Sequence, residues 1–212
     1  MTRKFGIDVT EHDFQFTRHW HLNRNGETFV KYIIPEYYNK PILYLELGVF
    51  EGMSTTWMFQ HVLCHPDSRA VVCDPWLQTR KLGPEKMEAV RVRAYHNLKP
   101  WTRTNRCKII RGNSAEVLRH MCGKGGYEGV SKNSVDLAFV DGNHNKFSVL
   151  DDVQHVYKLV KPGGMILFDD IENHIEKKNY VKQGVEMWLK EAGDTVKLEW
   201  KHRYMEGYRK SL

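Results

Sequence analysis

Two acidic motifs carry the side chains with the clearest chemical potential. The motif DGNH (residues 141–144) follows the apolar run of residues 135–140, and DD (residues 169–170) follows the run of residues 165–168. Carboxylates that lie close together repel one another and are costly to desolvate, so a divalent cation with oxygen ligands is their natural partner. Asp141, Asp169 and Asp170 are therefore candidate metal ligands. The alternative interpretation is that Asp-Gly forms a turn and Asp-Asp a solvated loop.

A glycine-containing turn lies earlier in the chain, in the sequence YLELGVFEGMST. An apolar run leads into Gly48, three residues separate it from Gly52, and a helix is predicted to begin near Ser54. Glycine permits a tight turn and a close approach of a ligand to the backbone, and the hydroxyls of Ser54 and Thr55 suit a helix N-terminus. The spacing is ExGxxxG and not GxGxxG, which argues against a dinucleotide.

Asp74 ends the second apolar run, 26 residues after Gly48. A carboxylate at that place can accept hydrogen bonds from both hydroxyls of a ribose. Each feature alone has an ordinary explanation, because such a turn can be only a tight connection and such an acid only a helix cap. Together they favour a nucleoside ligand.

The pattern of apolar runs predicts the elements that must position these residues. Strands are predicted at residues 42–47, 70–73, 108–110, 135–140 and 165–168, and helices between them at 55–63, 85–98, 114–121 and 147–160. Strands that alternate with helices indicate a parallel sheet covered on both faces, with ligands beyond the carboxyl ends of the strands. A helix at 181–191 and strands at 195–200 and 207–210 follow, and a helix at 27–38 precedes them. We expect one domain over residues 1–212, with a helical cap at 1–40.

These motifs resemble the class I S-adenosylmethionine-dependent methyltransferases, in particular the metal-dependent O-methyltransferases related to catechol and macrolide-sugar enzymes. LELGVFEGMST resembles their first motif and RGNSAEVL their segment after the third strand, and the resemblance covers residues 41–171. It implies a Rossmann-like, doubly wound sheet of seven strands, mostly parallel with the last strand antiparallel.

The resemblance also implies roles for individual residues. Asp74 would bind the ribose, Ser114 the adenine, and Asp141, Asp169 and Asp170 a metal ion, with Mg²⁺ expected. The residues that would surround the methionine part of the cofactor are Glu46, Gly48, Phe50 and Ser54, with Asp141 beside them.

His144, three residues after Asp141, occupies the place of the family's general base. An imidazole with a pKa of about 6.5 can take a hydroxyl proton near neutrality, and a bound metal would lower the pKa of that hydroxyl. The alternative is an exposed loop histidine in a chain that contains 11 histidines.

The charge distribution bears on the acceptor. Lys and Arg exceed Asp and Glu by six, and residues 75–106 alone hold eight basic residues against two acidic ones. With Trp76 and Trp101 near its ends, this basic insertion is predicted to form a lid for an anionic small molecule such as a sugar derivative. The alternatives are a solvated helix face, a nucleic-acid-binding protein or RNA methyltransferase that uses the insertion on phosphates, and a member that binds the cofactor without catalysis. The acidic motifs disfavour nucleic acid.

Other features of the composition are ordinary. No apolar stretch is long enough for a membrane helix, and residues 1–16 lack the apolar run of a secretory signal, so we expect a cytoplasmic protein without a membrane partner. The four cysteines show no metal-binding spacing and are expected to be reduced thiols. A homodimer is compatible with the sequence.

Overall fold

One mixed sheet of seven strands forms the centre of the computed structural model, which describes residues 6–10, 12–79, 82–172 and 179–212. The strands are β1 (Leu43–Leu47), β2 (Arg69–Asp74), β3 (Cys107–Arg111), β4 (Val135–Val140), β5 (Val160–Phe168), β6 (Val196–His202) and β7 (Met205–Lys210). Their order is β3-β2-β1-β4-β5-β7-β6, and β7 runs antiparallel to both of its neighbours. The predicted fold class, including the antiparallel last strand, is confirmed.

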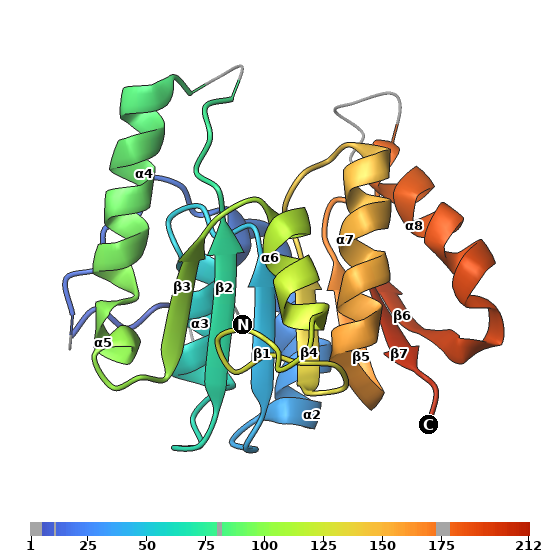
Figure 1. The fold of residues 1–212 in the computed structure, drawn as a ribbon. Coiled ribbons are helices and arrows are strands. Elements are labelled where there is room, and N and C mark those ends of the chain that lie inside the picture. Colours follow the sequence, from blue (N-terminus) through green and yellow to red (C-terminus); the bar gives the residue numbers. More distant parts are fainter. Residues whose placement is uncertain (1–5, 11, 80–81, 173–178) are drawn as a thin grey trace.

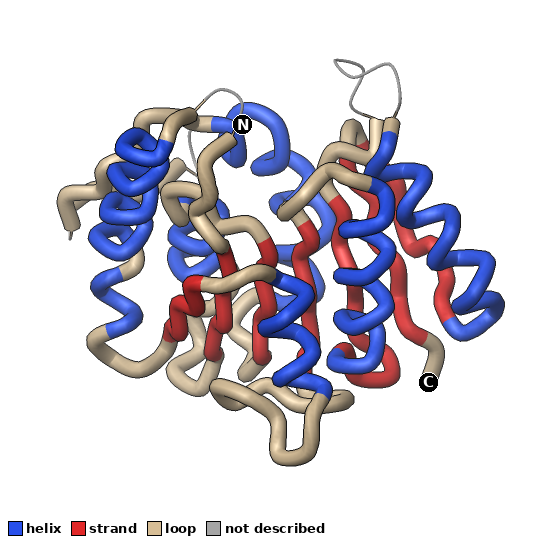
Figure 2. The backbone as a smooth tube through the Cα atoms, turned by 45° about the horizontal axis from the view of Figure 1, so that its top comes forward, coloured by secondary structure: helices blue, strands red, loops and turns tan. Residues whose placement is uncertain are grey.

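Helices cover both faces of the sheet (Figures 1 and 2). The main helices are α3 (Met53–His61), α4 (Pro84–Asn97), α6 (Ser114–Cys122), α7 (Lys146–Leu159) and α8 (Tyr180–Ala192), with the short α5 (Lys99–Thr102) after α4. Asparagine side chains cap the N-termini of α6 and α7. Asn113 accepts the backbone N–H of Ala115 and Asn145 that of Phe147, each at 3.0 Å. Because helices connect the parallel strands across the faces of the sheet, β1 to β5 all end at one edge, which is uppermost in Figure 1.

Two apolar layers pack against the sheet, and alternate residues of each strand contribute to one or the other. On β1, Tyr44 packs with the layer that contains Trp57 of α3, whereas Leu45 and Leu47 pack with the layer under α6, α7 and α8. This division follows from the strand geometry, in which successive side chains point to opposite faces. The sheet is thus buried on both sides, as the continuous apolar runs predict.

The N-terminal part differs from the predicted helical cap over residues 1–40. Helical structure extends from His21 to Tyr37, in the order η2 (His21–Asn25), α1 (Gly26–Thr28), η3 (Phe29–Ile33) and α2 (Ile34–Tyr37), where η2 and η3 are π-helical turns. Residues 6–10 and 12–19 form no helix and run beside α3 and α4, held by bonds such as Gln15 N–H to Asn97 Oδ1 at 2.7 Å. Below, "the cap" means residues 21–37.

Within the described residues, no helix combines the length and apolar character needed to cross a membrane. All four cysteines carry free thiols, of which Cys73 and Cys107 are buried. Burial raises the pKa of the Cys73 thiol to about 12, so it is protonated at neutral pH.

Candidate functional site

The glycine turn joins β1 to α3 at the edge where the parallel strands end. Gly48 has a φ of +88°, and a Cβ there would lie 1.9 Å from the backbone oxygen of Asp141. Backbone bonds fix the turn between its neighbours, because Gly48 N–H donates to Cys73 O and Asp141 N–H donates to Leu47 O, both at 2.9 Å. Any side chain at position 48 would therefore push the first acidic motif away from the turn.

Asp74 fixes the outer part of this turn. Its carboxylate accepts backbone N–H groups from Val49 at 2.8 Å, Phe50 at 3.0 Å and Trp76 at 2.7 Å. Three donors do not fill the roughly four lone-pair sites of a carboxylate, and Asp74 is only half-buried. The side chain thus organises the turn and keeps acceptor capacity for a ligand.

Glu46 lies beneath the turn with no exposed surface. Its carboxylate accepts hydroxyl groups from Ser54, from Thr55 at 2.6 Å and from Tyr44 at 3.1 Å. Burial raises the pKa of Glu46 to about 7, although these three hydrogen bonds act in the opposite direction. This enclosed carboxylate supports the turn from below, and its place beside the methionine part of the cofactor stays a prediction. Ser54, at 9% exposure, has its hydroxyl committed to that carboxylate.

Two aromatic residues beside the turn adopt left-handed backbone conformations. Phe50 has a φ of 51° and Trp76 a φ of 45°, and such conformations cost about 1–3 kcal/mol each for residues other than glycine. Trp76 is locked by a bond from its Nε1 to the Phe50 carbonyl oxygen at 2.9 Å, and the Phe50 ring lies 4.9 Å from that of Trp20, which is 54% exposed. An open aromatic surface therefore borders the turn.

Glu51 is a buried acid in the turn that the sequence motifs do not predict as a site residue. It is 1% exposed and accepts the backbone and hydroxyl groups of Thr17, both at 2.7 Å, and Nε of Arg93 at 2.6 Å. Its position between the two glycines of the ExGxxxG motif is the one signal that could have indicated a role. Glu51 ties the N-terminal segment and α4 to the glycine turn.

The two acidic motifs meet at the ends of β4 and β5. Asp141, His144 and Asp170 each offer one ligand atom, and these atoms lie within 4.8 Å of one another. His144 Nε2 is 3.4 Å from Asp170 Oδ2. Burial, together with the charges of Asp169 and Asp170, raises the pKa of Asp141 well above its ordinary range. A bound cation would relieve this repulsion.

Asp169 faces the cap and not the group formed by Asp141, His144 and Asp170. Its Oδ2 accepts the amide of Asn25 at 2.6 Å, and its Oδ1 accepts the backbone N–H of Asp170 at 2.8 Å. Arg24, the residue before Asn25, places its Nη2 2.6 Å from Asp170 Oδ1. The structure therefore brings together Asp141, Asp170 and His144 of the predicted residues, while Asp169 anchors the cap.

Ser114 is the first residue of α6 and lies half-buried near the same edge. Asp152 of α7, which the motif analysis did not single out, faces it. Burial raises the pKa of Asp152 to about 6, and a hydrogen bond from Ser114 opposes this rise. Asp152 is 1% exposed, and its Oδ2 has no hydrogen-bond partner in the described part of the chain.

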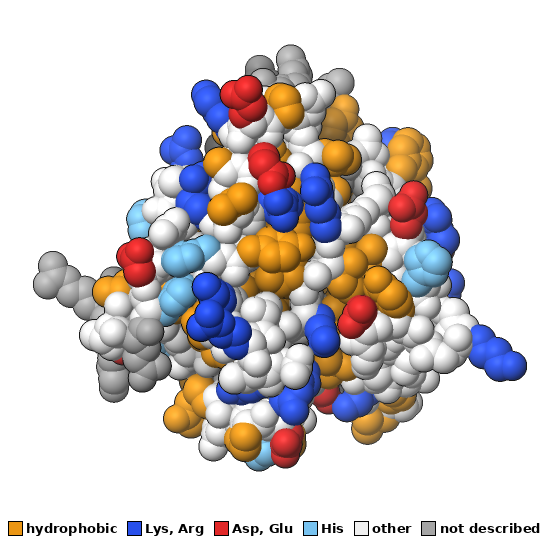
Figure 3. Space-filling model, turned by 60° about the vertical axis from the view of Figure 1, so that its left-hand side comes forward, with side chains coloured by type: hydrophobic (Ala, Val, Ile, Leu, Met, Phe, Trp, Pro, Cys, Tyr) orange, Lys and Arg blue, Asp and Glu red, His pale blue; other side chains and the backbone are white. Residues whose placement is uncertain are grey.

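The basic insertion contributes α4, α5 and the loop before α4. Figure 3 shows Lys and Arg side chains around an apolar area on the face that carries α4. Two of these basic side chains are engaged within the protein: Arg93 forms an ion pair with Glu51, and Arg106 donates to backbone carbonyls such as His65 O at 2.7 Å. Lys86, Lys99 and Arg103 are exposed, whereas residues 80–81 lie outside the described residues.

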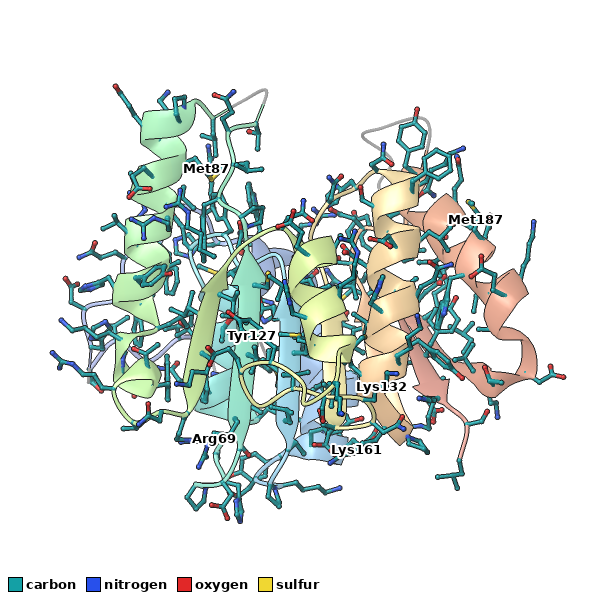
Figure 4. All side chains as sticks on the ribbon, in the orientation of Figure 1. Arg69, Met87, Tyr127, Lys132, Lys161 and Met187 are labelled. Carbon is teal, nitrogen blue, oxygen red and sulfur yellow. The ribbon has the colours of Figure 1, made fainter. Side chains whose placement is uncertain are left out.

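Basic side chains also occur far from this edge. Arg69 begins β2 and Lys161 lies near the start of β5, and Figure 4 shows both at the opposite end of the sheet. A shallow hollow there is lined by residues 122–126 with Ser131 and Lys132. None of the predicted site residues lines it. The edge that holds the glycine turn and the acidic motifs is therefore the candidate site.

A family model described as a methyltransferase domain matches residues 45–171, which is more than half of the chain. The chain belongs to this methyltransferase family. The match includes the glycine turn, Asp74 and both acidic motifs, and it confirms the resemblance to class I methyltransferases.

A sequence relative and several solved structures are also similar to this chain. Uncharacterized protein R132 of Acanthamoeba polyphaga mimivirus is 27% identical over 162 residues, which cover 75% of this chain but only 62% of that protein. A proposed rRNA methylase of Clostridium thermocellum has a TM-score of 0.59 at 12% identity, covering 87% of this chain and 96% of that one. The O-methyltransferase TomG of Streptomyces achromogenes, crystallised with S-adenosylmethionine, has a TM-score of 0.56 at 17% identity, covering 80% and 73%. At these identities the two structures establish the fold alone.

Proposed function

We propose that this methyltransferase uses S-adenosylmethionine to methylate a hydroxyl group of a small, polar and anionic acceptor, with help from a divalent metal ion such as Mg²⁺. One observation supports this most: the glycine turn held by Asp74 lies in backbone contact with Asp141, whose carboxylate belongs to the group of possible metal ligands. A cofactor at the turn and an acceptor at the acidic motifs would then be adjacent.

The turn fits the cofactor. S-adenosylmethionine supplies the methyl group from a sulfonium cation. Gly48 and Gly52, both with positive φ, keep side chains out of the turn, and Asp74 has acceptor capacity left for ribose hydroxyls. Ser114, where β3 leads into α6, lies opposite Asp152 of α7, and the unpartnered Oδ2 of Asp152 suits a donor group on the adenine side. The name of the TomG complex adds support by analogy.

The acidic motifs fit a hard divalent ion. The carboxylates of Asp141 and Asp170 offer ligand oxygens within 4.8 Å of one another, and waters and acceptor oxygens would complete the shell. Such an ion acts as a Lewis acid that lowers the pKa of an acceptor hydroxyl. Asp169, held by Asn25, remains a proposed ligand only if that bond exchanges.

His144 is proposed to remove the hydroxyl proton through Nε2. Its side chain is 40% exposed, so an acceptor can reach it, and its Nε2 lies 3.4 Å from Asp170 Oδ2. The site residues otherwise contribute by aligning the acceptor oxygen with the methyl group and by excluding water. Trp20 and the basic residues near the edge would contact the body and the anionic group of the acceptor.

Cofactor binding is tested by calorimetry with Asp74→Ala. We expect binding of S-adenosylmethionine to fall below detection, because the variant loses both the ribose acceptor and the anchor of the turn. Asp67→Ala, which removes an exposed carboxylate before β2, is the matched control and should bind like the wild type. Thermal melts of each variant show whether it is still folded. Wild-type affinity in a folded Asp74→Ala protein would remove the ribose assignment.

The metal and the base are tested together by turnover and metal titration. We expect EDTA to stop turnover, and His144→Ala to lower it by roughly 10²-fold or more, the scale of a general base. Unchanged cofactor and metal affinity in His144→Ala identifies a base, whereas weaker metal affinity identifies a ligand. Full activity in EDTA would refute metal assistance.

An RNA acceptor is the competing proposal. It is supported by the exposed Lys86, Lys99 and Arg103 and by the name of the Clostridium neighbour. Phosphate contacts would make RNA binding fall steeply with salt. Salt-dependent binding of RNA oligonucleotides that also carry label from the methyl donor would replace the small-molecule proposal.

A further inference from the structure

Arg24 brings a cation from the cap into the acidic motifs. Its Nη2 lies 2.6 Å from Asp170 Oδ1, and the two side chains are 31% and 9% exposed. The guanidinium carbon lies 4.6 Å from the centroid of the Tyr204 ring, in the turn between β6 and β7. Since 146 residues separate Arg24 from Asp170, this ion pair is a purely tertiary contact.

Asp170 therefore serves two sets of partners. Oδ1 is bound to Arg24, and the same carboxylate belongs with Asp141 and His144 to the group whose ligand atoms lie within 4.8 Å. A divalent ion bound there would lie close to the guanidinium and be repelled by it. It would also polarise the carboxylate and weaken the ion pair between Asp170 and Arg24. Arg24 lies at Oδ1 and the ion would lie near Oδ2, so the two positive charges would meet across one carboxylate and each would weaken binding of the other.

We propose that Arg24 is a built-in cation that balances the acidic motifs while they hold no metal and is displaced from Asp170 when a divalent ion binds. The cap and the ion thus compete for one carboxylate. This inference rests on the metal site of the proposed function and adds to it a positioning residue on the cap. Asn25 binds Asp169 and not Asp170, so the cap has an attachment to the end of β5 that does not involve the Asp170 carboxylate.

The test measures Mn²⁺ and Mg²⁺ affinity by calorimetry, without acceptor. We expect Arg24→Gln to bind either ion at least about tenfold more tightly than the wild type. Removing a positive charge beside the site should make the binding free energy of the ion more favourable by at least ~1.4 kcal/mol, which corresponds to a factor of ten in affinity. Arg24→Lys keeps the charge and should stay within about threefold of the wild type. Arg203→Gln is the matched control, since it removes another ion pair of the cap, with Glu27, and should change nothing.

A second measurement uses the unaltered protein, in case Arg24→Gln fails to fold. The ¹⁵Nε resonance of Arg24 should shift when Mg²⁺ is added and return with EDTA. Equal or weaker metal affinity in folded Arg24→Gln, or an unmoved Arg24 signal at saturating Mg²⁺, overturns the competition and leaves the metal site standing. Failure of every variant and of the wild type to bind either ion overturns the metal site as well.

Discussion

Glu46 shows how a single side chain can make the glycine turn sensitive to pH. The carboxylate has no exposed surface, and its partners are hydroxyl groups without charge. Burial raises its pKa from the ordinary value of 4.5 to about 7. The folded protein therefore binds a proton at this site more tightly than the unfolded chain does, so this group lowers the free energy of unfolding as pH rises from about 4.5 to about 7.

Glu46→Gln should remove this pH dependence. Relative to the wild type, the variant should gain free energy of unfolding as pH rises between about 4.5 and 7, by at most about 1.4 kcal/mol per pH unit. Urea unfolding at several pH values measures the difference. Glu116→Gln, at an exposed position on α6, is the control. A constant difference between Glu46→Gln and the wild type across the window would show that the carboxylate keeps its ordinary pKa.

At the scale of elements, the cap connects regions that the sheet alone would leave apart. Its residues contact the end of β5 through Asn25, the turn before β7 through Arg24, and α3 through His21, whose ring lies 5.4 Å from that of Trp57. His21 is 5% exposed, and neither ring nitrogen has a hydrogen-bond partner among the described residues. Burial lowers the pKa of His21 to about 3, so the ring is neutral in the folded protein.

This buried imidazole should weaken the cap in acid. Because its pKa is lower in the folded than in the unfolded protein, stability from this group is lost as pH falls from about 6.5 towards 3. His21→Phe should therefore gain stability relative to the wild type over that range, by at most about 1.4 kcal/mol per pH unit. Thermal melts of both proteins at pH 7 and pH 5 measure this difference in stability. His19→Phe, at an exposed position beside it, should show no such gain. Equal pH dependence in His21→Phe and the wild type would contradict the prediction.

At the scale of the whole molecule, the sequence predicted the sheet and its helices because their signals are local. Branched apolar runs and 3.6-residue periodicity located every main strand and helix, and the observed β4 has the predicted bounds. The start of β5 was missed by five residues. Val160 pairs with Val135 across a register shift, and Pro162, Gly163 and Gly164 within the strand hide it from the apolar pattern.

The candidate site was predictable only where it depends on strand ends. Asp141 and Asp170 meet because β4 and β5 are neighbours, and Gly48 and Asp74 meet because β1 and β2 are. The contacts of Arg24 with Asp170 and of Thr17 with Glu51 join residues 146 and 34 positions apart, and no local pattern encodes them. For the same reason the bond of Asp169 to Asn25 of the cap could not be predicted from the sequence.

The exposed ring of Trp20 against Phe50 gives the protein an optical property. Trp57, Trp76, Trp188 and Trp200 are at most 8% exposed and Trp101 is half-buried, whereas Trp20, just before the cap, is 54% exposed. A water-soluble quencher such as iodide therefore reaches Trp20 far more readily than the four buried rings. The most readily quenched part of the native fluorescence therefore comes from the mouth of the site, and the best protected part comes from the core. A ligand that covers this ring shields it from the quencher, so the unlabelled protein reports on its own site.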